Sequence, residues 1–116
     1  MPIQHISAVT LAVEDMARSL AFYQQLGFRI VYGGLDSTFS TVRSAEAVIN
    51  LAASPGHGAR WWGRVIFRVD DADAYHALLV TAGFRPENPR DAAWGERFFH
   101  VLDPDGHELS FAQLTG

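Results

Sequence analysis

The sequence contains no cysteine. This absence excludes disulfide bonds, thiolate catalysis and cysteine-ligated zinc together. There is also no apolar run near the roughly 18 consecutive residues that a membrane span requires. The first residues lack the basic segment followed by an apolar stretch that marks a secretory signal. We therefore expect a cytoplasmic protein with no membrane partner.

An excess of basic residues is missing as well. The chain has 9 Lys and Arg residues against 13 Asp and Glu residues, a formal net charge of −4 at pH 7. Because binding to nucleic acid requires a basic face, a nucleic-acid partner is not expected. What is present is ordinary for a globular protein: 48% of the 116 residues are hydrophobic and 19% are charged. This length fits one domain with a substantial core.

The chain contains an internal repeat. The segment from Val13 to Arg29 aligns with the segment from Val69 to Arg85 at a constant offset of 56 positions (69 − 13 and 85 − 29). Val, Asp, Ala, Gly, Phe and Arg match by type, and several of these are residues that begin or end secondary structure. The repeat predicts two copies of one structural unit.

Each copy begins with the pattern of a strand followed by a helix. In the first copy, the alternating run 9–13 predicts a strand, and Asp15 offers a side chain that caps a helix start. A helical stripe of apolar residues follows and ends at Gly27, which suits the left-handed conformation at a helix end. The second copy has the same features in run 65–69, Asp71 and Gly83.

Three further strand-like runs follow each helix. They are residues 28–32, 38–43 and 47–51 in the first half, and 84–85, 96–102 and 108–113 in the second. The tetrapeptide 103–106 (Asp-Pro-Asp-Gly) predicts a tight turn, and residues 52–63 predict a linker. The sequence thus predicts an α+β fold of two tandem βαβββ modules, about residues 1–54 and 60–116, within a single domain 1–116.

The two ends of the chain resemble those of one family. Residues 9–15, Ser19, Phe22-Tyr23 and 26–28 are similar to the opening module of the vicinal oxygen chelate superfamily, which includes glyoxalases, dioxygenases and bleomycin resistance proteins. Trp94-Gly95 and residues 103–109 resemble its closing hairpin, in the form seen in the bleomycin-resistance branch. The resemblance implies a curved mixed sheet, the cup, with both helices on its convex side. It also implies a homodimer.

Strand alternation predicts which side chains face the cup. Because Val9, Leu11 and Val13 form the apolar set that covers a helix, the even-numbered positions should point inward. The same parity holds in four strands. The inward set is then Ala8, Thr10, Ala12, Arg64, Ile66, Arg68, Phe98, His100, Leu102, Glu108, Ser110 and Ala112.

Metal-dependent members of the family carry histidine or glutamate at inward positions that correspond to Ala8, Arg64 and Ser110. A methyl group and a guanidinium have no lone pair to donate, and a lone hydroxyl is a weak ligand. Only His100 and Glu108 could face the cup together, and two ligands hold a metal poorly. We expect no metal and no other cofactor.

The candidate ligand-binding residues are Thr10, Arg64, Arg68, Trp94, Phe98, His100, Glu108 and Ser110. Two interpretations of the arginines stay open. Arg64 and Arg68 could bind an anionic ligand through paired hydrogen bonds, or they could form structural ion pairs with Glu108 or Glu96. No catalytic residue is assigned, although His100 has the chemistry of a general base.

Two classes of function follow. The preferred hypothesis is a non-catalytic protein that binds an antibiotic-like small molecule in the cup and so confers resistance. Bleomycin itself is not expected to be the ligand, because it is positively charged and Arg64 and Arg68 would repel it. The alternative is an enzyme of the same family (a lyase, isomerase or dioxygenase), with displaced metal ligands or with metal-free chemistry of His100 and Arg64. The ligand, and whether the expected dimer exchanges modules, stay open.

Overall fold

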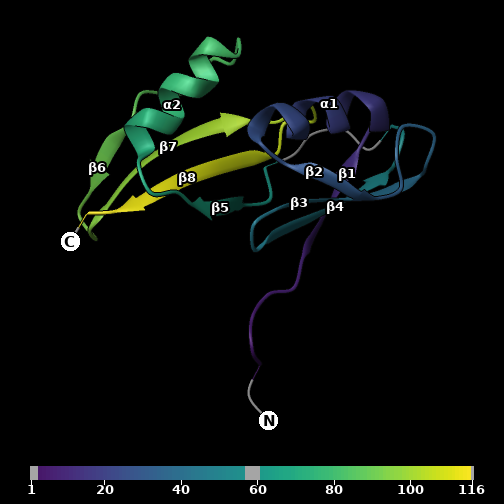
Figure 1. Cartoon of the computed structure of the whole chain (residues 1–116), viewed down its shortest axis with the longest axis horizontal. Coiled ribbons are helices and arrows are strands. Elements are labelled where there is room, and N and C mark those ends of the chain that lie inside the picture. Colours follow the sequence, from purple (N-terminus) through teal and green to yellow (C-terminus); the bar gives the residue numbers. More distant parts are fainter. Residues whose placement is uncertain (1–2, 57–60, 116) are drawn as a thin grey trace. The chain divides into compact units, whose positions relative to one another are not determined.

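A computed structural model describes residues 3–56 and 61–115 of the chain. The chain divides into two compact units, Met1–Gly58 and Ala59–Gly116. Each unit contains one helix and one four-stranded mixed sheet (Figure 1). The division falls within the expected linker 52–63, of which residues 57–60 lie outside the described residues. Within the described ranges, neither helix has the length and apolar character needed to cross a membrane.

The first unit follows the βαβββ order. It consists of β1 (Val9–Val13), α1 (Met16–Leu26), β2 (Arg29–Tyr32), β3 (Phe39–Ser44) and β4 (Ala47–Ala53). The strand order in the sheet is β1-β4-β3-β2. β1 pairs with β4 in parallel, and the other two pairings are antiparallel.

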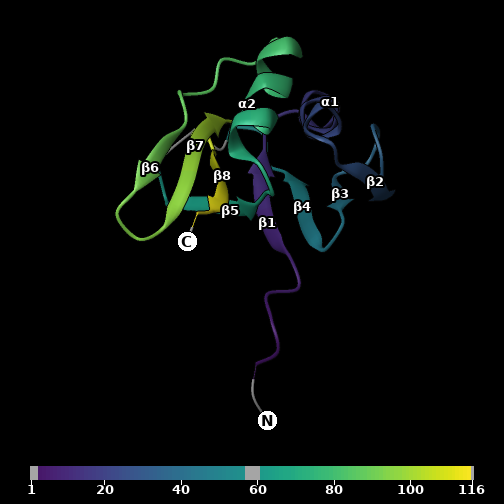
Figure 2. The same cartoon turned by 60° about the vertical axis from the view of Figure 1, so that its left-hand side comes forward.

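The second unit repeats this topology. It consists of β5 (Arg64–Arg68), α2 (Ala72–Thr81), β6 (Arg90–Ala92), β7 (Glu96–Leu102) and β8 (Glu108–Leu114), in the sheet order β5-β8-β7-β6. Here β5 pairs with β8 in parallel, and the other pairings are antiparallel. Figure 2 shows the two helices and the strands of each unit from a second direction. The predicted α+β fold of two tandem βαβββ modules is confirmed.

Both helices begin and end at the predicted residues. The carboxylate of Asp15 accepts a hydrogen bond of 3.1 Å from the Arg18 amide, and that of Asp71 accepts one of 3.0 Å from the Ala74 amide. These bonds satisfy amides that the first turn of a helix leaves free. Gly27 and Gly83 have φ values of 111° and 97°, a region that glycine adopts without steric strain.

One predicted strand was wrong. Residues 84–85 form no strand, and the fourth strand of the second sheet is β6, at Arg90–Ala92. The Phe84 amide closes the end of α2 by bonding to the Leu79 carbonyl (2.9 Å), so it is not free for a sheet. Pro86 and Pro89 then remove two further amide donors, which delays strand pairing until residue 90.

The buried cores confirm the predicted parity. Leu11 and Val13 of β1 are 2% and 0% exposed, whereas Thr10 between them is exposed. In β7 and β8 the buried odd-numbered residues are Phe99, Val101, Leu109 and Phe111, and Phe99 and Phe111 stack with ring centroids 5.3 Å apart. Each helix therefore covers one face of its sheet, and we call the other the helix-free face. It carries the even-numbered residues of β1, β4, β5, β6, β7 and β8; in β3 the parity is reversed, because Val42 pairs with Ile49 and both are buried.

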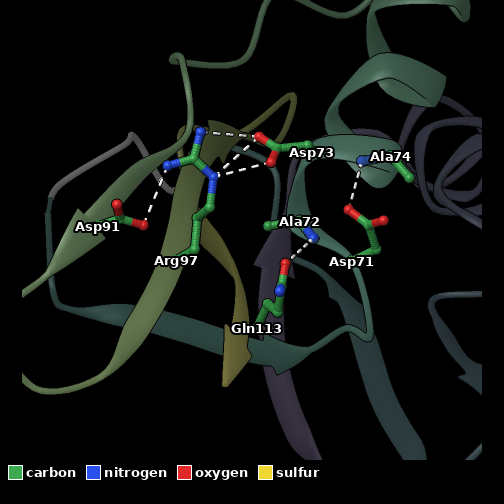
Figure 3. A network of polar contacts seen from close by, with 7 residues as sticks. All are labelled: Asp71, Ala72, Asp73, Ala74, Asp91, Arg97 and Gln113. Atoms are coloured by element: carbon green, nitrogen blue, oxygen red, sulfur yellow. Dashed lines mark hydrogen bonds and ion pairs between the residues drawn. The ribbon is translucent and has the colours of Figure 1, made fainter. Parts of the chain in front are cut away.

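An ion-pair cluster on the helix side links three elements of the second unit (Figure 3). The Arg97 Nε of β7 lies 3.0 Å from both carboxylate oxygens of Asp73 in α2, and its Nη1 lies 3.2 Å from Asp91 in β6. The hydrogen bonds to Asp73 and Asp91 raise the pKa of Arg97. The Ala72 amide bonds to Gln113 of β8 at 2.8 Å, which fixes the start of α2 on the sheet.

Candidate functional site

The helix-free face of the second sheet carries most of the candidate residues. Register places Arg64 opposite Glu108, and Ser110 between Ile66 and His100. The face also holds Arg68, Phe98, Glu96 and Arg90, and Trp94 lies in the turn between β6 and β7. Thr10 belongs to the sheet of the first unit.

Ser110 is more deeply buried than an open cup position implies. Its exposed fraction is 3%, and that of Ala112 on the same face is 1%. Both residues belong to β8, a central strand of the sheet, where longer side chains on the flanking strands cover them. A ligand on this face would therefore meet the flanking side chains first.

Arg64 forms an ion pair with Glu108. The arginine Nε donates a hydrogen bond to the Oε2 of the glutamate, across the parallel pair β5–β8. Burial is the largest single influence on the pKa of Glu108 and acts to raise it, whereas the hydrogen bond from Arg64 acts to lower it. The charges of His100 and Arg64 and a hydrogen bond from Trp61 add to that effect, so the pKa lies below its usual 4.5. Glu108 is thus a carboxylate at neutral pH.

Arg68 belongs to a second chain of contacts. Its Nη2 lies 3.4 Å from the Oε2 of Glu96, while the other oxygen of that carboxylate accepts a 2.8 Å hydrogen bond from the Trp94 indole. Trp94 is 72% exposed, yet this bond fixes its ring. The ring lies nearly parallel to that of Phe98, with centroids 6.1 Å apart and 23° between the planes. An exposed, oriented aromatic ring results.

Phe98 is the centre of this aromatic group. The Arg90 guanidinium lies 4.9 Å from its ring centroid, within the range of a cation–π contact. The His100 ring lies 5.3 Å away on the other neighbouring position of the face. The group presents flat surfaces with hydrogen-bonding edges, the combination that suits a planar polar ligand.

A pocket of about 300 Å³ opens beside His100. Its lining residues are Arg85, Glu87, His100, Val101, Leu102 and Glu108. The Glu87 amide donates to the His100 carbonyl at 3.1 Å and holds the segment before β6 against β7. The Nδ1 of His100 is buried with no hydrogen-bond partner among the residues that the structure describes, so the Nε2 is the ring nitrogen left for a ligand.

The first unit has a polar row on its helix-free face. The Thr41 hydroxyl donates to the Asn50 side-chain oxygen at 2.7 Å, and the Asn50 amide donates to the Thr10 hydroxyl oxygen at 3.3 Å. These three residues face one another across β3, β4 and β1. Thr10 therefore belongs to an uncharged row. Asn50 and Thr41 were not among the binding residues predicted from the sequence.

The side chains present do not fit a bound divalent metal. In residues 3–56 and 61–115, no group of three or more His, Asp or Glu residues is arranged to hold a metal ion. Arg64 has no lone pair to donate, the neutral hydroxyl of Ser110 is a weak ligand, and Glu108 already accepts from Arg64. The Nδ1 of His107 accepts a 2.8 Å hydrogen bond from the Trp62 indole, which occupies that nitrogen.

Comparison with known proteins decides the family. The family model described as the Glyoxalase/Bleomycin resistance protein/Dioxygenase superfamily matches residues 3–111. The chain belongs to this superfamily. A bleomycin resistance protein from Klebsiella pneumoniae is 25% identical over 112 residues, which cover 89% of this chain and 87% of that protein.

Solved structures of this superfamily have the same fold. A bleomycin resistance determinant encoded on the transposon Tn5 superposes with a TM-score of 0.83 at 25% identity, covering 96% of this chain and 98% of that one. An antibiotic binding protein from Streptomyces sp. CB03234 has a TM-score of 0.78 at 26% identity, with 99% of each chain covered. The fold hosts different chemistries, so function has to be argued from the site.

Proposed function

We propose that this superfamily member is a non-catalytic protein that binds an antibiotic-like small molecule on the helix-free face of its second sheet. The relatives support the class of function, because proteins similar over nearly the whole chain bind an antibiotic or confer resistance to bleomycin. Thr10, on the sheet of the first unit, stays a prediction as a ligand-binding residue.

The observation that carries the proposal is the fixed orientation of Trp94. The indole is 72% exposed but is held by Glu96, which in turn accepts from Arg68. Ordering a side chain on binding costs free energy, and an aromatic ring that is already ordered avoids that cost. A flat ligand would stack on Trp94 with Phe98 and Arg90 alongside.

The ion pairs change the expected charge of the ligand. Two unpaired cations at positions 64 and 68 would repel positively charged bleomycin. Each instead has a carboxylate partner, Glu108 and Glu96 respectively. Since a paired charge repels a ligand much less than a free one, a cationic glycopeptide of the bleomycin type becomes the first ligand to test.

Calorimetric titration of the protein with bleomycin and a panel of other planar antibiotics tests the proposal. We expect Trp94→Ala to weaken binding by about 1–2 kcal/mol, since an aromatic contact and its buried area are lost. Trp62→Phe is the control, because Trp62 bonds to His107 and not to the proposed site. Flat isotherms for every antibiotic would remove the proposal.

A second candidate function is an enzyme that uses no metal. It is favoured by one observation: His100 and Glu108 line the same pocket and interact electrostatically, with Arg64 beside them. His100 would act as the general base in such chemistry, and Arg64 would stabilise developing negative charge. Consumption of a bound ligand that stops in His100→Ala would favour this alternative over sequestration.

A further inference from the structure

The pocket beside His100 contains charged residues that are left without partners. The side chains of Arg85 and Glu87 both line it, and neither forms an ion pair within the part of the chain that the structure describes. Both residues come from the segment that precedes β6, which the Glu87 amide anchors to the His100 carbonyl. One cation and one anion thus line a single pocket without forming an ion pair with each other.

A second carboxylate reaches the pocket from β8. Glu108 shares the lining with Glu87, and its pKa lies below its usual value, so it is ionised at neutral pH. Its ion pair with Arg64 engages one oxygen, Oε2. A carboxylate accepts several hydrogen bonds, so Glu108 retains acceptor capacity for a ligand.

The other lining residues and the volume of the pocket limit the size and polarity of the molecule that it can bind. Leu102 supplies an apolar side chain, and His100 supplies one available ring nitrogen. A volume of about 300 Å³ lies at the lower end for small-molecule sites, which range over roughly 300–1,000 Å³. The occupant must therefore be small, or must be one terminal group of a larger molecule.

We propose that this pocket binds the zwitterionic head group of an α-amino acid that carries an apolar side chain. The ammonium would donate to the carboxylates of Glu87 and Glu108, and the carboxylate would accept from Arg85. The apolar side chain would contact Leu102. The inference rests on the proposed function, because His100 and Glu108 belong to the same face, and it assigns an amino-acid-like group to the ligand.

Titration of the isotopically labelled full chain with L-leucine, followed by amide NMR, tests the inference. The Glu87 amide is a built-in reporter, since its hydrogen bond to His100 crosses the edge of the pocket. We expect saturable shifts at the amides of residues 85, 87, 100–102 and 108. Leucinamide keeps only the ammonium and 4-methylpentanoate keeps only the carboxylate, and each should bind roughly tenfold more weakly, because one charge-assisted contact is lost.

Two variants test the ammonium contact and the carboxylate contact of the ligand separately. Glu87→Gln should weaken L-leucine roughly tenfold and leave 4-methylpentanoate unchanged, while Arg85→Gln should weaken L-leucine similarly and leave leucinamide unchanged. Arg29→Gln, an exposed position on β2 in the first unit, is the matched control. Residues 85 and 87 are exposed, so both variants should unfold at the wild-type temperature.

The outcomes distinguish the two proposals. If an antibiotic binds but L-leucine produces no saturable shifts, the inference is wrong and the proposed function stands. If leucinamide binds as tightly as L-leucine, the pocket is a cation site, and the zwitterion is likewise wrong. If L-leucine binds with the expected variant pattern and no antibiotic binds, the inference holds and the proposed antibiotic sequestration fails.

Discussion

Arg64 and Glu108 are register partners on the parallel strands β5 and β8, and the arginine Nε donates to the glutamate. The pKa of Glu108 lies below its usual 4.5, so the folded state favours the ionised form more than the unfolded state does. This contribution to stability is present above pH 4.5 and is lost as the pH falls through the lowered pKa. We expect stability to decrease on acidification.

Urea unfolding at pH 7 and pH 3 measures this effect. Glu108→Gln should lower the free energy of unfolding at pH 7 by less than about 1 kcal/mol, because Arg64 is partly exposed and solvent screens the pair. The difference from wild type should shrink as the pH falls through the lowered pKa of Glu108, because protonation removes the charge that Glu108→Gln also removes. Glu46→Gln, in the exposed turn between β3 and β4, serves as the control. An equal difference at both pH values would contradict the role of the ion pair.

Replacing Phe98 and replacing Phe99, which are adjacent in β7, should affect stability and ligand binding differently. Phe99 is 1% exposed and stacks on Phe111, so Phe99→Ala should destabilise the protein by about 3–5 kcal/mol. Phe98 lies on the helix-free face, and Phe98→Ala should cost clearly less stability but weaken ligand binding. Chemical denaturation and calorimetric titration of both variants measure this. If the two variants lost equal stability, the assignment of the faces would be wrong.

The Asp71 cap makes a local prediction. Asp71→Ala removes the acceptor of the Ala74 amide and should lower the free energy of unfolding by about 1 kcal/mol. Asp71→Asn keeps an acceptor oxygen and should cost much less. Thermal unfolding of these two variants measures the effect of the cap. The effect of Asp71→Ala, measured again in a chain that also carries Asp15→Ala, tests whether the caps of the two units act independently. Unchanged stability in Asp71→Ala would contradict the cap.

The sequence predicted the repeat, the caps and the faces because each depends on local rules. Alternation along a strand assigns sides without coordinates, and aspartate before a helix and glycine after it act within one turn. The strand error at residues 84–85 has the same local origin, since Pro86 and Pro89 lack amide donors and strand pairing begins only at residue 90.

Contacts between distant residues could not be predicted in the same way. Parity put Arg64 and Arg68 on one face but left ion pairing and anion binding equally open. Which carboxylate each arginine meets depends on the register of β8 and β7, which the strand pattern does not fix. The bond from Trp94 to Glu96 joins side chains two residues apart, yet it depends on the turn at Gly95, whose φ is 87°.

The superfamily resemblance leads us to expect a homodimer. Light scattering at micromolar concentration should then give twice the 12.8 kDa mass of one chain. The measurement should be repeated with a saturating antibiotic, because a ligand that contacts both chains would stabilise the dimer by mass action. A single 12.8 kDa species under both conditions would contradict the expectation.

Metal content separates the proposed binding protein from a metal-dependent enzyme. The family resemblance implies metal ligands at two positions that Arg64 and Ser110 occupy here. The guanidinium of Arg64 is paired and the hydroxyl of Ser110 is buried, and neither group binds a divalent cation well. We therefore expect protein dialysed against zinc, iron, manganese or nickel to retain much less than one ion per chain in elemental analysis. Arg64→His with Ser110→Glu would add two potential ligands and should raise retention of zinc, provided that the fold is kept. One ion per wild-type chain would overturn the non-catalytic proposal.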